Sequence, residues 1–292
     1  MKRLGIIGLG LMGGSLGMAV KHACSDITIL GYARREENRQ RALELGAVDV
    51  VSGNPREIIA TADLVVCCLP VLAIPEILNE LADAFKDNAV ITDVGSTKET
   101  IQREMTTLFS DRQIAFVGSH PICGSEMKGI EFARADLYQN AVTIITNGDN
   151  PVATTMVAYL WRLTGSRVIK MDAAQHDRYL ARTSHLPHLT ASLLSATIGR
   201  DSVTTKLAAC CGTGFKDTTR LAEGTPEIWK DIVQTNHEEI TNEFMALKKN
   251  IEIMLAMLEN RDFEAIEIFL TEARDLRRKM IAMGEKQHDS EE

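Results

Sequence analysis

The chain has 292 residues, 45% hydrophobic and 25% charged, a composition typical of a globular protein that buries a core in one large domain or two ordinary ones. Its net charge of -8 argues against nucleic acid as the main partner, because phosphate binding needs a basic surface, although a few local arginines could still bind a small anion. The sequence shows no membrane-spanning segment, no secretory signal and no zinc-like spacing of its six cysteines, so we expect a cytoplasmic protein with reduced cysteines.

The first 170 residues alternate short β-branched runs with helical stretches, which is the pattern of a parallel sheet with crossover helices. Two of the runs, 64–69 and 89–92, are apolar throughout, as strands covered on both faces should be. We therefore predict an α/β fold whose N-terminal domain, residues 1–170, is a Rossmann-like, doubly wound and mostly parallel sheet. The candidate strands are 4–8, 27–32, 64–69, 90–93, 115–119, 142–146 and 167–170.

The sequence after Met171 carries no further strand signal and indicates an all-helical C-terminal domain over residues 171–285, followed by a polar tail at 286–292. Apolar residues recur near the end of this domain in steps of three and four. Such a seam packs either against a partner subunit or within an intramolecular helical hairpin, and we favour a homodimer. The seam consists of Ile240, Phe244, Leu247, Ile251, Met254 and Leu258, followed by Phe263, Ile266, Phe269 and Leu270.

A glycine-rich turn follows the first predicted strand and opens a helix. Its sequence has the GxGxxG spacing, which is a strong signal of a dinucleotide site in this strand–turn–helix context. The glycines permit a tight turn and let the backbone approach a pyrophosphate at the helix N-terminus. The alternative is a tight turn without a ligand. The expected cofactor-binding residues here are Gly8, Gly10, Leu11, Met12 and Gly13.

Two arginines follow the second predicted strand, at the point where an NAD site usually carries Asp or Glu for the ribose 2′-hydroxyl. A carboxylate would repel the 2′-phosphate of NADP, whereas the guanidinium groups of Arg34 and Arg35 match a phosphate. The substitution favours NADP over NAD. The alternative is that both arginines are solvated surface charge and that Glu36 or Glu37 binds the ribose.

Polar residues gather at the ends of two further predicted strands, in segments 93–98 and 118–126. Both segments should lie in the crevice at the carboxyl ends of the strands, where doubly wound folds bind ligands. The helical half adds the segments 176–177, 184–188 and 214–220, with Trp229 shortly after.

These segments read DVGSTK, SHPICGSE, HD, SHLPH and FKDTTR, and they occur in the order and spacing of the prephenate/arogenate dehydrogenase family. The likeness extends from Gly8 to about Trp229, and the helical remainder resembles the family's dimerisation region. The resemblance implies an NAD(P)-dependent enzyme of tyrosine biosynthesis. Such an enzyme oxidatively decarboxylates prephenate to 4-hydroxyphenylpyruvate, or arogenate to tyrosine.

The resemblance also implies roles for individual residues. His120 resembles the catalytic histidine that removes the proton of the ring 4-hydroxyl while hydride leaves the same carbon. Ser96 resembles the serine that orients this histidine and reaches the nicotinamide, and Arg220 resembles the arginine that binds a substrate carboxylate. The other family positions at the pocket are Ser125, Glu126 (a gate residue), His188, Asp217 (reaching a neighbouring subunit's site) and Trp229.

General chemistry is consistent with these roles. Removing the hydroxyl proton needs a base within hydrogen-bond reach, and a histidine is suited to that task near neutral pH. Loss of CO2 needs no acid catalyst because aromatisation drives it, and an arginine binds a carboxylate through two hydrogen bonds. One departure from the family is Lys216, which stands where arginine is usual and lacks the planar fork.

Less specific interpretations of the same residues remain open. His120 could be an ordinary loop residue that caps backbone groups. His185 and His188 could share a helix face and bind a metal, but Pro187 interrupts the helix between them and no further ligands accompany them, so we expect no metal site.

Two other functions compete with the main interpretation. β-Hydroxyacid dehydrogenases share the opening glycine motif, but they use a lysine from the second domain where this chain has SHLPH. A non-catalytic NADP-binding regulator would bind the cofactor without turnover. Both prephenate and arogenate stay open as substrates, and a small-molecule substrate is the expected partner, with neither nucleic acid nor membrane.

Overall fold

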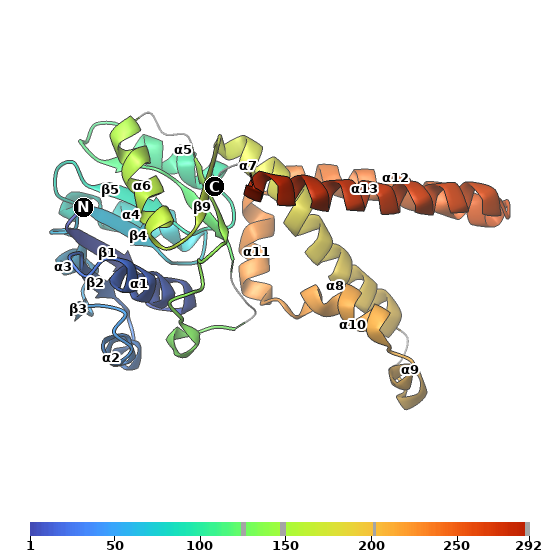
Figure 1. Ribbon diagram of the computed structural model, residues 1–292, viewed down its shortest axis with the longest axis horizontal. Helices are drawn as coiled ribbons and strands as arrows, with labels where there is room; N and C mark the ends of the chain where they lie inside the picture. The colour runs from blue at the N-terminus through green and yellow to red at the C-terminus, as the bar shows by residue number, and fades with distance from the viewer. Residues whose placement is uncertain (124–126, 147–149, 201–202, 290–292) are drawn as a thin grey trace. The chain divides into compact units, whose positions relative to one another are not determined.

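The computed structural model describes residues 1–123, 127–146, 150–200 and 203–289, with side chains as far as residue 284. The chain forms two compact units, Met1–Ile240 and Thr241–Glu292. Figure 1 shows the strands and the helices among them in the first part of the chain, followed by helices only. Among the described residues no strand follows Met171, in agreement with the sequence pattern.

A six-stranded parallel sheet organises the first unit. Its strand order is β3-β2-β1-β4-β5-β6, so the order reverses between β1 and β4. This is the doubly wound Rossmann arrangement, and it confirms the predicted fold class. The strands are β1 (Arg3–Ile7), β2 (Thr28–Tyr32), β3 (Val50–Ser52), β4 (Leu64–Cys67), β5 (Val90–Asp93) and β6 (Ala115–Phe116).

Alternate residues of these strands belong to two separate hydrophobic clusters. In β4, Leu64 and Val66 belong to one cluster, whereas Val65 and Cys67 belong to the other. Neighbouring side chains of a strand point to opposite faces, so the two clusters cover the two faces of the sheet. The apolar run at 64–69 is therefore explained by burial on both sides.

A second, three-stranded sheet was not anticipated from the sequence. It has the order β7-β8-β9, in which β7 pairs antiparallel and β9 parallel with β8. Its strands are β7 (Ser119–Ile122), β8 (Val142–Thr146) and β9 (Arg167–Met171). The predicted strand 115–119 was wrong in its extent, because the chain leaves the first sheet after Phe116 and enters the second at Ser119. His120 therefore lies within a strand and not in a loop after one. The short strand β3 was missed.

The helices follow the predicted division of the chain. In the first part they are α1 (Leu11–Ala23), α2 (Glu36–Glu44), α3 (Pro55–Ile59), α4 (Ala73–Glu80), η1 (Ala82–Ala84), α5 (Glu99–Leu108), η2 (Ile130–Phe132) and α6 (Pro151–Leu163). After β9 come α7 (Ala173–Leu180), η3 (Ala181–His185), α8 (Leu186–Gly199), α9 (Thr205–Ala209), α10 (Thr213–Thr219), η4 (Arg220–Glu223), α11 (Pro226–Thr235), α12 (His237–Glu259) and α13 (Phe263–Asp289).

Helices α7 and α8 form one continuous helical segment joined by a single π-helical turn, η3. The turn ends two residues before Pro187, whose ring would collide with the carbonyl four residues earlier in a regular α-helix. A wider turn relieves that collision, and such turns are common at functional sites. The expectation that Pro187 interrupts the helix was wrong, because the wider π turn lets the helix continue past the proline.

Thr241–Glu292 is a helical hairpin made by most of α12 and by α13. Arg261, with φ 54°, lies in the turn between the two helices. None of the described side chains in this unit is buried, and twelve large hydrophobic ones are more than a third exposed. Helix α13 continues into the predicted polar tail as far as Asp289. No helix in the described residues is both long and apolar enough to cross a membrane.

The close packing of α1 on the chain after α2 gives a test of the fold. A Cβ at Gly17 would lie 1.9 Å from the carbonyl oxygen of Ala47, which is backbone and cannot move freely. Alanine normally favours a helix by up to about 1 kcal/mol over glycine, but overpacking costs about 1–3 kcal/mol. We expect Gly17→Ala to lower the free energy of unfolding in urea denaturation.

The matched control is Gly214→Ala in α10, where a Cβ would meet nothing within 4 Å. That variant should be as stable as the parent or slightly more so. Equal stability of the two variants would contradict the close packing of α1.

Candidate functional site

The glycine turn after β1 lies where the strand order of the large sheet reverses. Gly8 has φ +106°, and a Cβ there would lie 2.4 Å from the carbonyl oxygen of Cys68 at the end of β4. A Cβ at Gly13 would lie 2.0 Å from the carbonyl oxygen of Gly8. A Cβ at Gly10, by contrast, would meet nothing within 4 Å. Gly8 and Gly13 are thus required by the fold, whereas Gly10 faces open space that a ligand can enter.

The N-terminus of α1 fits an anion. Within the described residues no side chain caps this helix, and its first turn contains no acidic residue. The backbone N–H groups of the first turn and the positive end of the helix dipole are therefore available to a phosphate group. The turn and the helix end together fit the pyrophosphate of a dinucleotide, at the position where doubly wound sheets bind one.

The loop after β2 presents two cations. Arg34 and Arg35 are both exposed and form no ion pair with the described part of the chain. Arg39, which the sequence analysis did not single out, donates to the carbonyl oxygens of Ala33 (2.8 Å) and Arg34 (2.9 Å) and forms an ion pair with Glu36. One of the two acids considered as ribose ligands is thus already engaged by an arginine.

Replacing Gly10 should weaken binding of the cofactor without changing the stability of the fold. Its φ of -106° suits alanine, so Gly10→Ala should leave the free energy of unfolding unchanged within about 0.5 kcal/mol. The added methyl group occupies the space of the approaching cofactor, and we expect the Kd for the nicotinamide cofactor to rise by about tenfold or more, measured by fluorescence titration.

Gly13→Ala is the matched control, and it should destabilise the fold because its Cβ meets backbone. If Gly10→Ala bound the cofactor like the parent chain, the turn would not be the pyrophosphate site.

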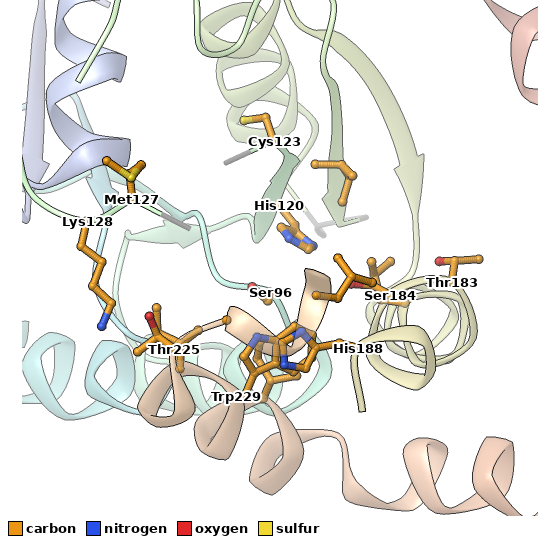
Figure 2. Close-up of a pocket in the computed structure, with 16 residues that line it drawn as sticks. Ser96, His120, Cys123, Met127, Lys128, Thr183, Ser184, His188, Thr225 and Trp229 are labelled. Carbon is orange, nitrogen blue, oxygen red and sulfur yellow. The ribbon is translucent and has the colours of Figure 1, made fainter. Parts of the chain in front are cut away.

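A pocket of about 750 Å³ lies within the first unit, between β5, β7 and the helical segments. Figure 2 shows His120 and Ser96 facing this space, with His188 and Trp229 on its opposite side. The pocket is lined by Ser96, His120, Ile122, Cys123, Met127, Lys128, Leu180, Thr183, Ser184, His188, Leu221, Gly224, Thr225, Ile228, Trp229 and Ile232.

His120 enters the pocket at the end of a chain of hydrogen bonds. Its Nδ1 lies 2.9 Å from Nε2 of His176, and Nδ1 of His176 lies 2.7 Å from Oδ1 of Asp177. His176 and Asp177 are both almost completely inaccessible to solvent. Asp177 also accepts hydrogen bonds from the backbone N–H groups of Lys98 (2.7 Å) and Glu99 (2.9 Å), so it caps α5. These hydrogen bonds join α7 to the start of α5.

A second buried acid, Asp93, holds β5 to β7. Its carboxylate forms an ion pair with the buried Lys98 and accepts the backbone N–H groups of Gly95 (2.8 Å) and Ser119 (3.0 Å). The hydroxyl of Ser119 in turn accepts the indole N–H of Trp161 (2.9 Å). Buried charges are tolerated only when paired and hydrogen-bonded, and this network satisfies both conditions. It fixes the residue that directly precedes His120.

The histidines around the pocket are held in their neutral form. Burial lowers the pKa of His120 well below its usual range, with a further contribution from His176 and Lys98. Burial also lowers the pKa values of His176 and His188, and it lowers that of His185 to about 4. Desolvation disfavours the charged imidazolium. At neutral pH, His120 can therefore accept a proton.

A stacked pair of rings forms one wall of the pocket. The imidazole of His188 lies on the indole of Trp229 with 3.4 Å between ring centroids and 10° between planes. His185 contacts the same indole edge to face, 6.0 Å away. Gly224 packs against the stack, since a Cβ there would lie 2.5 Å from Cε1 of His188. These contacts leave little rotational freedom to either ring.

The structure brings four of the expected site residues together in this pocket, namely Ser96, His120, His188 and Trp229. Arg220 and Asp217 are exposed and are not among the lining residues. Ser125 and Glu126 lie outside the described residues. Their assigned roles stay predictions, as does the orientation of His120 by Ser96. The described residues contain no cluster of three or more metal-ligating side chains.

Sequence reasoning overlooked two features of the pocket. Lys128 supplies a cationic side chain at the pocket, although no motif singled it out. The HD motif was noticed at His176, but no role was assigned to it, because 56 residues separate His176 from His120. Only the fold reveals their contact.

A dinucleotide-type glycine turn, together with a pocket that contains a buried histidine, is typical of a nicotinamide-dependent dehydrogenase. Residues 16–170 match the family described as prephenate dehydrogenase, nucleotide-binding domain, and residues 172–272 match prephenate dehydrogenase, dimerization domain. The chain belongs to the prephenate dehydrogenase family. The β-hydroxyacid dehydrogenase interpretation is therefore disfavoured.

Individual relatives agree with this assignment. The chain is 32% identical to a prephenate dehydrogenase of Lactococcus lactis, over 96% of this chain and 78% of the relative. It is 35% identical to a cyclohexadienyl dehydrogenase of Zymomonas mobilis, over 80% of this chain and 81% of the relative. Its structure resembles that of prephenate dehydrogenase from A. aeolicus in complex with hydroxyphenyl propionate and NAD+, with a TM-score of 0.88, 28% identity and coverage of 96% and 98% of the two chains.

The neutral histidines predict a loss of stability in mild acid. In the unfolded chain His185 binds a proton below a pKa of about 6.5, whereas in the folded chain it does so only below about 4. Protons therefore bind preferentially to the unfolded chain between these values, and the free energy of unfolding falls as the pH drops from about 6.5 to about 4. We expect His185 alone to account for about 3 kcal/mol of that fall.

Urea denaturation between pH 7.5 and 4.5 measures this dependence. Asn236 donates to Nδ1 of His185 (3.2 Å), and the amide oxygen of Asn can accept the same bond, so His185→Asn should fold and show a shallower pH dependence. His22→Asn, at an exposed position on α1, is the matched control and should keep the slope of the parent chain. An unchanged slope in His185→Asn would contradict the buried neutral state of His185.

Proposed function

We propose that the chain catalyses the oxidative decarboxylation of prephenate or arogenate, with NADP as the preferred hydride acceptor. Membership of the prephenate dehydrogenase family supports the reaction type. The observation that carries the proposal is the half-buried, neutral His120, which lies in the pocket beside Ser96. Ser96 follows β5, which belongs to the same parallel sheet as β1 and its glycine turn. His120 lies on β7, the strand of the second sheet that comes after β6 in the chain.

His120 acts as the general base in this proposal. It accepts the proton of the ring 4-hydroxyl at Nε2, which lowers the barrier to forming a carbonyl at that carbon as hydride leaves it. A bound nicotinamide supplies the electron-pair acceptor for the oxidation. Ser96 lies on the same side of the pocket, and its hydroxyl group donates a hydrogen bond to the reacting oxygen. Departure of CO2 needs no protein acid, since formation of the aromatic ring drives it.

The pocket suits an anionic, partly apolar ring compound. Leu221, Ile228 and the Trp229–His188 stack offer apolar surface to a six-membered ring. Lys128 supplies a positive charge at the pocket, and Arg220 follows directly on α10, one residue before Leu221. We assign both cations to the two carboxylates of the substrate, with the fork of Arg220 better suited to a bidentate contact. Ser125, Glu126 and Asp217 keep the roles that their positions in the family motifs suggest.

The preference for NADP rests on charge at the end of β2. The 2′-phosphate of NADP adds a dianion at the position where Arg34 and Arg35 are exposed, and Glu36 is paired with Arg39 instead of facing the ribose. Each charge-assisted hydrogen bond to a phosphate contributes about 1.5–3 kcal/mol. NAD remains the weaker cofactor in this proposal, although the A. aeolicus relative was solved with NAD+.

The helical part of the chain forms a homodimer in the proposed assembly, with the domain boundary at residues 170 and 171 and the helical domain ending near 285. The match of residues 172–272 to a dimerization domain supports oligomerisation. The large exposed hydrophobic side chains of Thr241–Glu292 provide the surface that association would bury.

Cofactor choice is tested by assaying the purified protein with prephenate or arogenate against NAD or NADP. We expect turnover with at least one ring substrate and a higher kcat/KM with NADP. Arg34→Gln combined with Arg35→Gln should raise the KM for NADP by about 100-fold or more, because two phosphate contacts are lost, and should change the KM for NAD little.

Arg41→Gln is the matched control, since Arg41 lies on α2 and pairs with Glu44 away from the β2 turn. A parent chain that used NAD as efficiently as NADP would refute the cofactor preference.

The base is tested by His120→Asn, which preserves the size and polarity of the side chain but cannot take up a proton. We expect kcat to fall by about 10²–10⁴-fold with little change in the Kd for the cofactor, measured by stopped-flow and fluorescence titration. Near-parental turnover in this variant would show that another group removes the hydroxyl proton.

A further inference from the structure

His120 lies at the pocket end of a series of three hydrogen-bonded side chains, which continues through His176 to Asp177. The ring nitrogen that does not face His176 is Nε2, and among the described residues it has no hydrogen-bond partner. From this chain we propose that His176 and Asp177 are positioning residues, which keep His120 in the tautomer with an unprotonated Nε2 and stabilise the proton that it takes up. The inference rests on the proposed role of His120 as the base, and it assigns tasks to two residues that the reaction scheme leaves out.

The direction of each hydrogen bond fixes the tautomer. A carboxylate only accepts hydrogen bonds, so Nδ1 of His176 carries the proton in its 2.7 Å contact with Asp177. A neutral imidazole has one donor and one acceptor, which leaves Nε2 of His176 as the acceptor in its 2.9 Å contact with His120. Nδ1 of His120 must then be the donor. Its Nε2 is left with a lone pair, as a base requires.

Burial of His176 and Asp177 keeps the tautomers of the two histidines fixed. His176 is fully enclosed and Asp177 is 1% exposed, so water cannot replace either partner. The carboxylate itself is fixed by two backbone N–H groups at the start of α5. The direction of each hydrogen bond is therefore set at the start of α5 and passed through Asp177 and His176 to His120. Reversing any of these hydrogen bonds would leave a buried polar group without a partner.

The same arrangement determines how readily His120 takes up charge. When the substrate O–H bond breaks and an Nε2–H bond forms, His120 becomes an imidazolium that still donates its Nδ1–H to His176. Asp93 and Lys98 form an ion pair with each other, which leaves Asp177 as the carboxylate that stabilises this cation. The titratable and charged groups that face the two histidines are Asp93, Lys98, Asp177 and His185.

Asp177→Asn tests the electrostatic part of the inference. Asn can still accept a hydrogen bond but carries no charge, so the cation on His120 becomes less favourable. The acidic limb of the kcat–pH profile, which reports protonation of the base, should move to lower pH by about one unit. The maximal kcat should fall by about tenfold or more, because a weaker base gains less in the transition state.

Two substitutions at His176 test the tautomer. The amide oxygen of Gln can accept the Nδ1–H of His120, whereas Leu cannot. We expect His176→Gln to keep kcat within about tenfold of the parent and His176→Leu to lose about 100-fold or more, with the KM for the cofactor unchanged in both. A purely structural role would affect the two variants alike and would leave the pH profile in place. His22→Asn, at the exposed position used above, should change none of these quantities.

A measurement without turnover covers the case in which the variants fail to fold. In the parent chain labelled with ¹⁵N-histidine, NMR at neutral pH should show Nε2 of His120 unprotonated and Nδ1 protonated, with the resonances assigned from through-bond and through-space correlations in the parent chain itself. A protonated Nε2 would overturn the inference whatever the activity.

The outcomes also separate this inference from the proposed function. If His120→Asn were inactive while Asp177→Asn and His176→Leu kept the parental kcat and pH profile, His120 would be the base without any support from the chain behind it. If His120→Asn itself turned over normally, the proposed function would have the wrong base. The NMR measurement would still decide the tautomer of His120 independently of that result.

Discussion

The site depends on the Asp177 carboxylate, which joins two parts of the first unit that are far apart in sequence. It caps the start of α5 through the backbone of Lys98 and Glu99, and it accepts a hydrogen bond from His176 on its own helix. Burying an ion costs several kcal/mol unless hydrogen bonds and opposite partial charges replace its hydration. Here the N–H groups and the dipole of a helix N-terminus provide that replacement. Helix α7, whose last residue Leu180 lines the pocket, is thereby fixed against the start of α5.

The two sides of the site have different physical characters. On the sheet side, Ser119 and His120 are fixed by hydrogen bonds to Asp93 and His176, which suits the part of the protein that holds the proposed base. On the helical side, Leu221 and Ile228 are substantially exposed. Exposed positions can adapt to a ligand, so recognition of the substrate side chain belongs more naturally to the helical side.

Positive side chains gather near the site although the net charge of the chain is negative. The chain has a net charge of -8, but the loop after β2 presents Arg34 and Arg35, and the pocket includes Lys128. The histidines nearest the pocket are kept neutral by burial. An acidic surface discourages unspecific anion binding, whereas these few cations are the groups to which we assign the phosphate of the cofactor and a carboxylate of the substrate.

The sequence by itself determined the α/β class, the glycine turn, the arginines after β2 and the motifs of the family, because each depends on residues close together in the chain. Glycine spacing and apolar runs report local backbone geometry and burial, which tertiary contacts here did not override. The extent of the strand before His120 was misjudged, since the chain changes sheets within a few residues and both sheets accept the same apolar pattern.

Only the tertiary structure decided which groups meet. The partner of His120 is His176, 56 residues away, and the partner of the α5 backbone is Asp177, 79 residues from Lys98. It also placed Lys128 at the pocket and left Arg220 outside the lining residues. Such pairings arise from the packing of α7 against α5 and β8. No periodicity in the sequence records them, because hydrogen bonds across a fold depend on distance in space and not along the chain.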